Sequence, residues 1–97
     1  MAEFFLRPKA VADLDSIWDY TADTWGEEQA ERYIRMLNAG FERLAKEPTR
    51  GRPCDEIREG YLRHRVGHHV VFFRILESGD LDVVRVLHES MDFGSHL

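Results

Sequence analysis

A single cysteine, only three prolines and no long apolar run set the first limits on this 97-residue chain. Cys54 cannot form an internal disulfide, and no basic start is followed by an apolar run and a cleavage site, so we expect a reduced, cytoplasmic setting. Apolar runs such as Val70 to Phe73 are far shorter than the roughly 20 residues that span a bilayer, which predicts no membrane association. No glycine-rich loop or nucleophile elbow is present, and no cofactor is predicted.

Lysine is absent after Lys46, and acids outnumber bases 18 to 13, which gives a net charge of −5. This balance argues against nucleic-acid binding by the chain alone, because such binders gain affinity by neutralising phosphates. The second half instead carries arginine, whose planar fork suits paired contacts with carboxylates. These arginines are Arg50, Arg52, Arg58, Arg63, Arg65, Arg74 and Arg85.

The first half of the sequence predicts a short strand followed by two helices. Residues 3–7 form the strand, and Pro8 suits the first turn of a helix over about 8–25 with apolar residues at three- and four-residue steps. Gly26 interrupts the pattern, and a second amphipathic helix follows over about 27–47. Because the link is so short, the two helices must be antiparallel.

Beyond Pro48 the spacing changes to that of strands. A loop over 49–53 is followed by predicted strands at about 60–66, 69–77 and 81–88 and by a C-terminal tail over 89–97. Short links predict an antiparallel meander, and the first strand joins one edge to give a four-stranded sheet covered by the helices. The expected fold is one α+β domain, residues 1–97, in the order β-α-α-β-β-β.

Several segments, in this order, resemble the ParE/RelE superfamily of bacterial toxins, on the ParE side, over nearly the whole chain. The segments are Pro8, Ala10, Asp13-Leu14, Ile17-Trp18-Asp19-Tyr20, Ala30, Leu44, Pro48, Gly51-Arg52-Pro53, Val66-Gly67-His68-His69-Val70-Val71-Phe72-Phe73-Arg74, Val84-Arg85-Val86-Leu87-His88 and Met91-Asp92. The resemblance implies a toxin of a type II toxin–antitoxin system that inhibits DNA gyrase and is neutralised by a ParD-like antitoxin. The antitoxin would wrap a disordered segment around the toxin.

The RelE branch of the same superfamily cleaves mRNA on the ribosome, and this is the alternative function. The cations that stabilise its transition state would be Arg65 and Arg85, and the group that transfers a proton would be His88. The acidic net charge disfavours work inside ribosomal RNA, and Met91-Asp92-Phe93 stands where the RelE branch usually offers a catalytic aromatic or second histidine. We therefore expect no enzyme activity. A member that only binds its antitoxin and represses its operon is a third possibility.

Two local clusters suggest chemistry that the sequence does not support. His64, His68 and His69 are close in sequence, but successive side chains of a strand point to opposite faces, so no metal site is predicted and we expect exposed strand-end residues. The acids after Cys54 would raise the pKa of its thiol, which makes it an incidental loop residue.

Two groups of residues are candidates for binding a partner protein. The helix aromatics Trp18, Tyr20, Trp25 and Tyr33 are expected in or beside the core, but Tyr20 or Trp25, if exposed, would be an anchor for a partner. The strand arginines Arg63, Arg65, Arg74 and Arg85 would receive carboxylates from the antitoxin or gyrase. Alternatively, each pairs with a local acid such as Glu77, Asp82 or Glu89.

Overall fold

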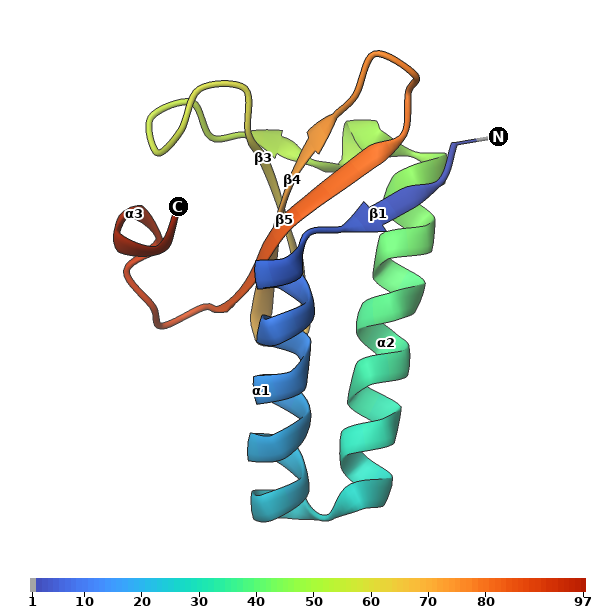
Figure 1. Ribbon diagram of the computed structural model, residues 1–97, viewed down its shortest axis with the longest axis vertical. Coiled ribbons are helices and arrows are strands. Elements are labelled where there is room, and N and C mark those ends of the chain that lie inside the picture. Colours follow the sequence, from blue (N-terminus) through green and yellow to red (C-terminus); the bar gives the residue numbers. More distant parts are fainter. Residues whose placement is uncertain (1) are drawn as a thin grey trace.

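Two long antiparallel helices form a hairpin in the computed structural model, which describes residues 2–97 (Figure 1). Helix α1 spans Pro8–Trp25 and α2 spans Glu27–Lys46. Gly26 joins them at φ 97°, a backbone conformation that favours glycine. Glu27 and Glu28 place negative charge at the start of α2, and Arg43 and Lys46 place positive charge at its end, as the helix dipole prefers.

The sheet has five strands in the order β1-β5-β4-β3-β2. They are β1 (Phe4–Leu6), β2 (Arg52–Pro53), β3 (Leu62–Val66), β4 (His69–Ile75) and β5 (Leu81–His88). β1 pairs in parallel with β5, and the remaining neighbours pair antiparallel. The α+β class, the helical hairpin and the edge position of the first strand are confirmed.

Each face of the sheet carries its own apolar cluster. The larger cluster lies under the helical hairpin and contains Leu37 and Phe41 of α2 with Val71 and Phe73 of β4. The smaller cluster lies on the face turned away from the hairpin, which we call the far face, and its buried members are Cys54, Val70, Phe72 and Leu87. A short helix, α3 (Phe93–His96), lies across the sheet from α2 and helps to cover this face (Figure 1).

Two expectations were wrong on the far face and at the sheet edge. The sheet has five strands because the predicted loop contains η1 (Pro48–Arg50) and the two-residue strand β2, whose Arg52 and Pro53 pair with β3. Residues 89–97 are not a loose tail, because the Phe93 ring packs 5.0 Å from that of Phe72. Cys54 lies in a loop, as expected, and is fully buried beneath this layer.

Five boundaries, in four elements, also differ by one or two residues, and each difference has a local cause. The first strand is shorter at both ends, because Glu3 makes only one backbone bond to β5, from the Leu81 N–H, and Arg7 already occupies the N-cap position of α1. α2 ends at Lys46 rather than at 47, because Glu47 leaves helical geometry at φ −134°. β3 begins at Leu62 rather than at 60, since Gly60 turns the chain at φ 82°. β4 ends at Ile75 rather than at 77, since the Leu76 N–H bonds Asp80 across the next turn.

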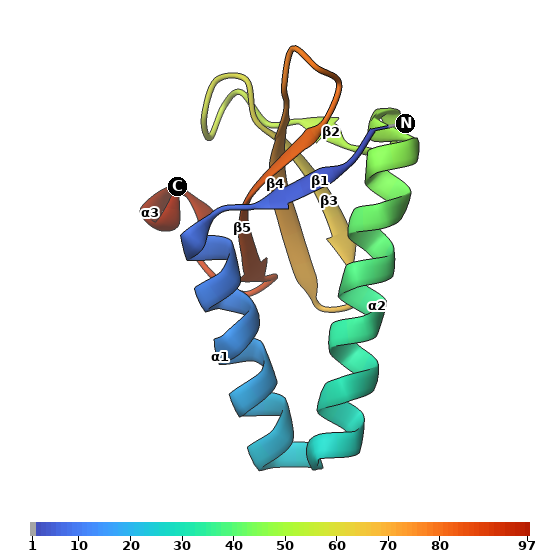
Figure 2. The same cartoon turned by 45° about the vertical axis from the view of Figure 1, so that its right-hand side comes forward.

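The helical hairpin is longer than the sheet that it covers. α2 has 20 residues, about 30 Å at 1.5 Å per residue, whereas β3, β4 and β5 have 5, 7 and 8 residues, about 17 to 27 Å. Figures 1 and 2 both show the Gly26 end of the hairpin projecting past the sheet. Neither helix is long and apolar enough to cross a membrane within the described residues.

A candidate protein-docking site

An open groove of about 1120 Å³ lies where the projecting half of the hairpin passes the end of the sheet. We call it the hairpin groove. Both helices, the β3–β4 turn and the end of β5 contribute to it. Its lining is Asp13, Ser16, Ile17, Tyr20, Thr21, Trp25, Gln29, Tyr33, Met36, Gly67, His68, His69, Val86, Leu87, His88 and Met91.

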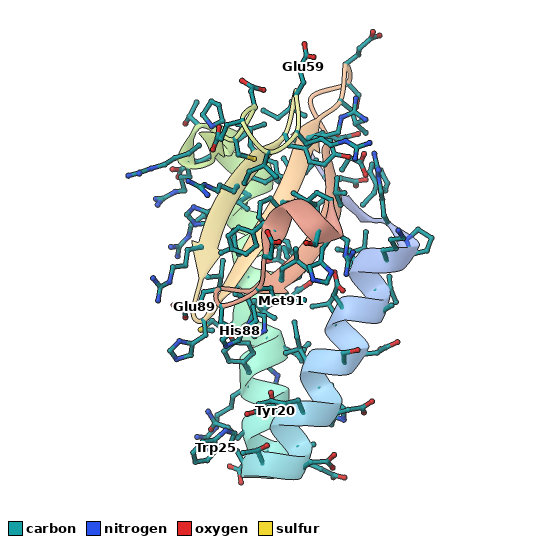
Figure 3. The ribbon with its side chains drawn as sticks, turned by 90° about the vertical axis from the view of Figure 1, so that its left-hand side faces the viewer. Tyr20, Trp25, Glu59, His88, Glu89 and Met91 are labelled. Carbon is teal, nitrogen blue, oxygen red and sulfur yellow. The ribbon has the colours of Figure 1, made fainter. Side chains whose placement is uncertain are left out.

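Large apolar side chains of the helices are exposed along this groove. Tyr20 and Trp25 are 69% and 71% exposed, and Met36 is 40% exposed (Figure 3). The expectation that Tyr20 and Trp25 belong to the core was therefore wrong, whereas Trp18 and Tyr33 are partly buried as a core-edge position requires. The reason is geometric: the sheet ends before it reaches Tyr20 and Trp25. Exposed aromatic side chains in a concave surface are typical anchors for a protein partner.

A hydrogen-bonded set joins the helices to the β3–β4 turn at the floor of the groove. The Tyr33 hydroxyl accepts the His68 backbone N–H at 3.0 Å and donates to His69 Nδ1 at 2.6 Å. Burial and the neighbouring imidazoles of His88 and His68 lower the pKa of His69 to about 4. Burial also raises the pKa of Tyr33. His69 is thus neutral at pH 7 and half-buried, not the exposed strand-end residue that was expected.

The other histidines at this end are engaged separately. His68 Nδ1 lies 2.8 Å from Glu89, and this contact, with nearby Arg65, lowers the pKa of Glu89. His88 Nδ1 accepts the Ser90 backbone N–H at 3.1 Å, and its ring stands edge-on to that of His69 at 5.2 Å. Across residues 2–97, no group of three or more acid, histidine or cysteine side chains is arranged to hold a metal ion.

Arg85 is held inside the molecule. Its Nε and Nη2 atoms each donate to the Asp13 carboxylate at 2.7 Å, and Nη1 donates to the His96 carbonyl at 2.9 Å. The same carboxylate accepts the Val86 backbone N–H at 2.9 Å. Hydrogen bonding to Asp13 raises the pKa of Arg85. This arginine therefore ties α1, β5 and α3 together, a role that sequence reasoning missed.

The other strand arginines remain closer to the surface. The strand register places Arg63, Arg65, Arg74 and Arg85 all on the far face, since Arg63 and Arg85 flank Phe72 on neighbouring strands. Arg65 forms an ion pair with Glu89 at 3.1 Å, one of the local pairings considered from the sequence. Arg63 and Arg74 form no ion pair within the described chain, and Asp82, opposite Arg74, is bound instead by Arg7 at 2.6 Å.

The three residues named for the alternative nuclease each have a partner within the described chain. Arg85 is bound by Asp13, Arg65 is bound by Glu89, and the Nδ1 atom of His88 is occupied by Ser90. Burial raises the pKa of the Cys54 thiol more than its acidic neighbours do, which argues against a nucleophile.

Comparison with known proteins gives one family over nearly the whole chain. Residues 4–93 match the family model described as the ParE toxin of the type II toxin–antitoxin system parDE. Toxin ParE1 of Mycobacterium tuberculosis is 47% identical over 96 residues, which cover 99% of this chain and 98% of the relative. Toxin ParE1 of Caulobacter vibrioides is 43% identical over 97 residues, which cover 100% and 99%.

A solved structure shares the fold. A chain of the chromosomal ParDE TA system from P. aeruginosa superposes with a TM-score of 0.79 and 22% identity, covering 91% of this chain and 96% of that one. The fold expected from the sequence is thereby confirmed on independent grounds.

Proposed function

Since the chain belongs to the ParE toxin family of type II toxin–antitoxin systems, we propose that it acts by binding other proteins, with DNA gyrase as its target and a ParD-like antitoxin as its inhibitor. The observation that carries this proposal is the hairpin groove, which exposes Tyr20 and Trp25. A stable monomer gains nothing by leaving such side chains in water, whereas interfaces concentrate their binding energy on them.

Electrostatics supports binding over catalysis. The chain carries a net charge of −5, which opposes work on RNA, and the cations that a nuclease would need are engaged by Asp13 and Glu89. The histidine next to the groove floor, His69, has a pKa of about 4, far from the value that suits general acid–base chemistry at pH 7.

A supercoiling assay with purified gyrase tests the target. We expect the wild-type chain to inhibit, and the double variant Tyr20→Ser/Trp25→Ser to require at least about tenfold more protein for the same inhibition. Phe5→Ser is the matched control, because Phe5 is 51% exposed but does not line the groove. Absence of inhibition by the folded wild-type chain at every stoichiometry would refute gyrase as the target.

Co-purification with a ParD-like antitoxin tests the inhibitor, and it uses the wild-type chain, the Tyr20→Ser/Trp25→Ser variant and the Phe5→Ser control. Loss of capture by the double variant alone supports the groove as the docking site. Conversely, specific mRNA cleavage in a translation extract, abolished by His88→Ala, would establish the ribonuclease in place of the gyrase inhibitor.

A further inference from the structure

Two arginines face each other across the edge of the sheet without an acid between them. Arg52 of β2 and Arg63 of β3 are directly paired in the strand register, so their side chains rise from the same face. Like charges in this arrangement destabilise a sheet. Among residues 2–97, neither arginine forms an ion pair or a side-chain hydrogen bond. The fold thus keeps an unfavourable contact.

Within residues 2–97, Arg43, Arg58 and Arg74 also form no ion pair, but Arg52 and Arg63 differ from them in facing each other across two paired strands. Acids outnumber bases 18 to 13, and most of the other arginines have carboxylate partners. The nearest acids along the chain, Asp55 and Glu56, lie close enough to influence the same thiol as Arg63, but Asp55 accepts the Gly60 N–H and Glu56 forms no ion pair in the described structure. The paired arginines are Arg7, Arg32, Arg35, Arg50, Arg65 and Arg85.

A row of positive charge continues from this pair toward the hairpin groove. Arg65 follows Arg63 by two residues on β3, about 7 Å further along the same face. Its partner Glu89 also contacts His68, which lines the groove. Arg52, Arg63 and Arg65, which we call the arginine row, therefore lead from the outer edge of the sheet to the mouth of the groove.

We propose that the arginine row binds an acidic, extended segment of a protein partner, whose carboxylates bridge Arg52 and Arg63. An extended chain places alternate side chains on one side about 7 Å apart, which matches the spacing from Arg63 to Arg65, and a carboxylate at Arg65 would replace its solvent-exposed partner Glu89. Forked guanidinium groups bind carboxylates through two hydrogen bonds. The inference deepens the proposed protein-binding function, since the same partner can occupy the groove and the row. Nucleic acid is the less favoured ligand because the chain as a whole is acidic.

An NMR titration with a hexaglutamate peptide tests the row directly. We expect the peptide to shift the arginine Nε–H signals of Arg52 and Arg63 and the backbone amides of β2 and β3, and the double variant Arg52→Ser/Arg63→Ser to bind about tenfold more weakly. The control is Arg32→Ser/Arg43→Ser on the solvent side of α2, which removes the same charge and should leave the affinity unchanged within about twofold. A single-stranded oligothymidylate of the same charge is titrated in parallel.

The peptide titrations test the arginine row, and the gyrase assay tests the proposed function independently. Equal binding of hexaglutamate by wild-type and the Arg52→Ser/Arg63→Ser variant, or no binding by the wild-type, overturns the arginine row as an acidic-peptide site. Preference for oligothymidylate at the same residues also overturns it and makes the row a phosphate site. The variant proteins are then assayed with gyrase: inhibition by the wild-type chain upholds the proposed function whatever the peptide titration gives.

Discussion

Removal of the Asp13 carboxylate should destabilise the protein more than any other single change at its surface. Asp13 and Arg85 are only 13% and 15% exposed, and three donors converge on the carboxylate at 2.7–2.9 Å. Asp13→Ala leaves the Val86 N–H and the Nε and Nη2 atoms of Arg85 without their acceptor, because no other carboxylate in residues 2–97 bonds them. Breaking a buried pair costs about 3 to 5 kcal/mol, and residual solvent contact places this one near 3 kcal/mol. The melting temperature should fall by roughly 12 to 24 °C.

Urea unfolding followed by circular dichroism measures this effect. The double variant Asp13→Leu/Arg85→Leu should cost less than the sum of Asp13→Ala and Arg85→Leu, because neither charge is then left unpaired. The exposed pair Glu28–Arg32 provides the control, and Arg32→Ala should change the free energy of unfolding by less than about 0.5 kcal/mol. A free energy of unfolding for Asp13→Ala within about 0.5 kcal/mol of wild type would refute the reasoning.

Three further outcomes are expected. The pKa of His69 is about 4 in the folded protein and 6.5 in the unfolded chain, so the unfolded chain binds the proton at a higher pH. The free energy of unfolding should therefore fall by about 1 to 2 kcal/mol from pH 7 to pH 5, and urea titrations of His69→Gln should show a smaller fall. Gly51→Ala places a methyl group against the Phe73 ring and should lower the free energy of unfolding by about 1 to 3 kcal/mol, whereas Gly94→Ala, at an uncrowded site, should leave it nearly unchanged. Equal urea midpoints for the two variants would contradict crowding at Gly51. Phe93→Ala should uncover the far face and accelerate labelling of Cys54 by a thiol reagent, and an unchanged rate would mean that α3 does not protect it.

The elements that local chemistry determines were predictable from the sequence. Pro8, Gly26 and Pro48 mark the helix ends, and the change from helical spacing to alternation after residue 60 marks the meander. Each of these signals acts within a few residues, where backbone preferences and turn chemistry dominate. The family resemblance rested on the same segments and is confirmed by the comparisons.

What escaped prediction depends on contacts between distant parts of the chain. Asp13 and Arg85 are 72 residues apart, and nothing in either neighbourhood shows that they meet. β2 has two residues and exists only because β3 lies beside it. The exposure of Trp25 left no such signal either, because the predicted strands of 7 to 9 residues, about 23 to 31 Å, are long enough to accompany a predicted helix of 18 residues, about 27 Å.

The parallel pairing of β1 with β5 has a consequence for synthesis of the protein. Phe4 pairs with Leu81, so the first strand must wait until almost the whole chain has been made before its partner exists. At about 5 to 20 residues per second, the 75 residues from Arg7 to Leu81 take roughly 4 to 15 s to translate. Throughout that interval the nascent helices have no complete sheet to cover their apolar stripes, and another polypeptide present at the ribosome would meet them before the native fold can close.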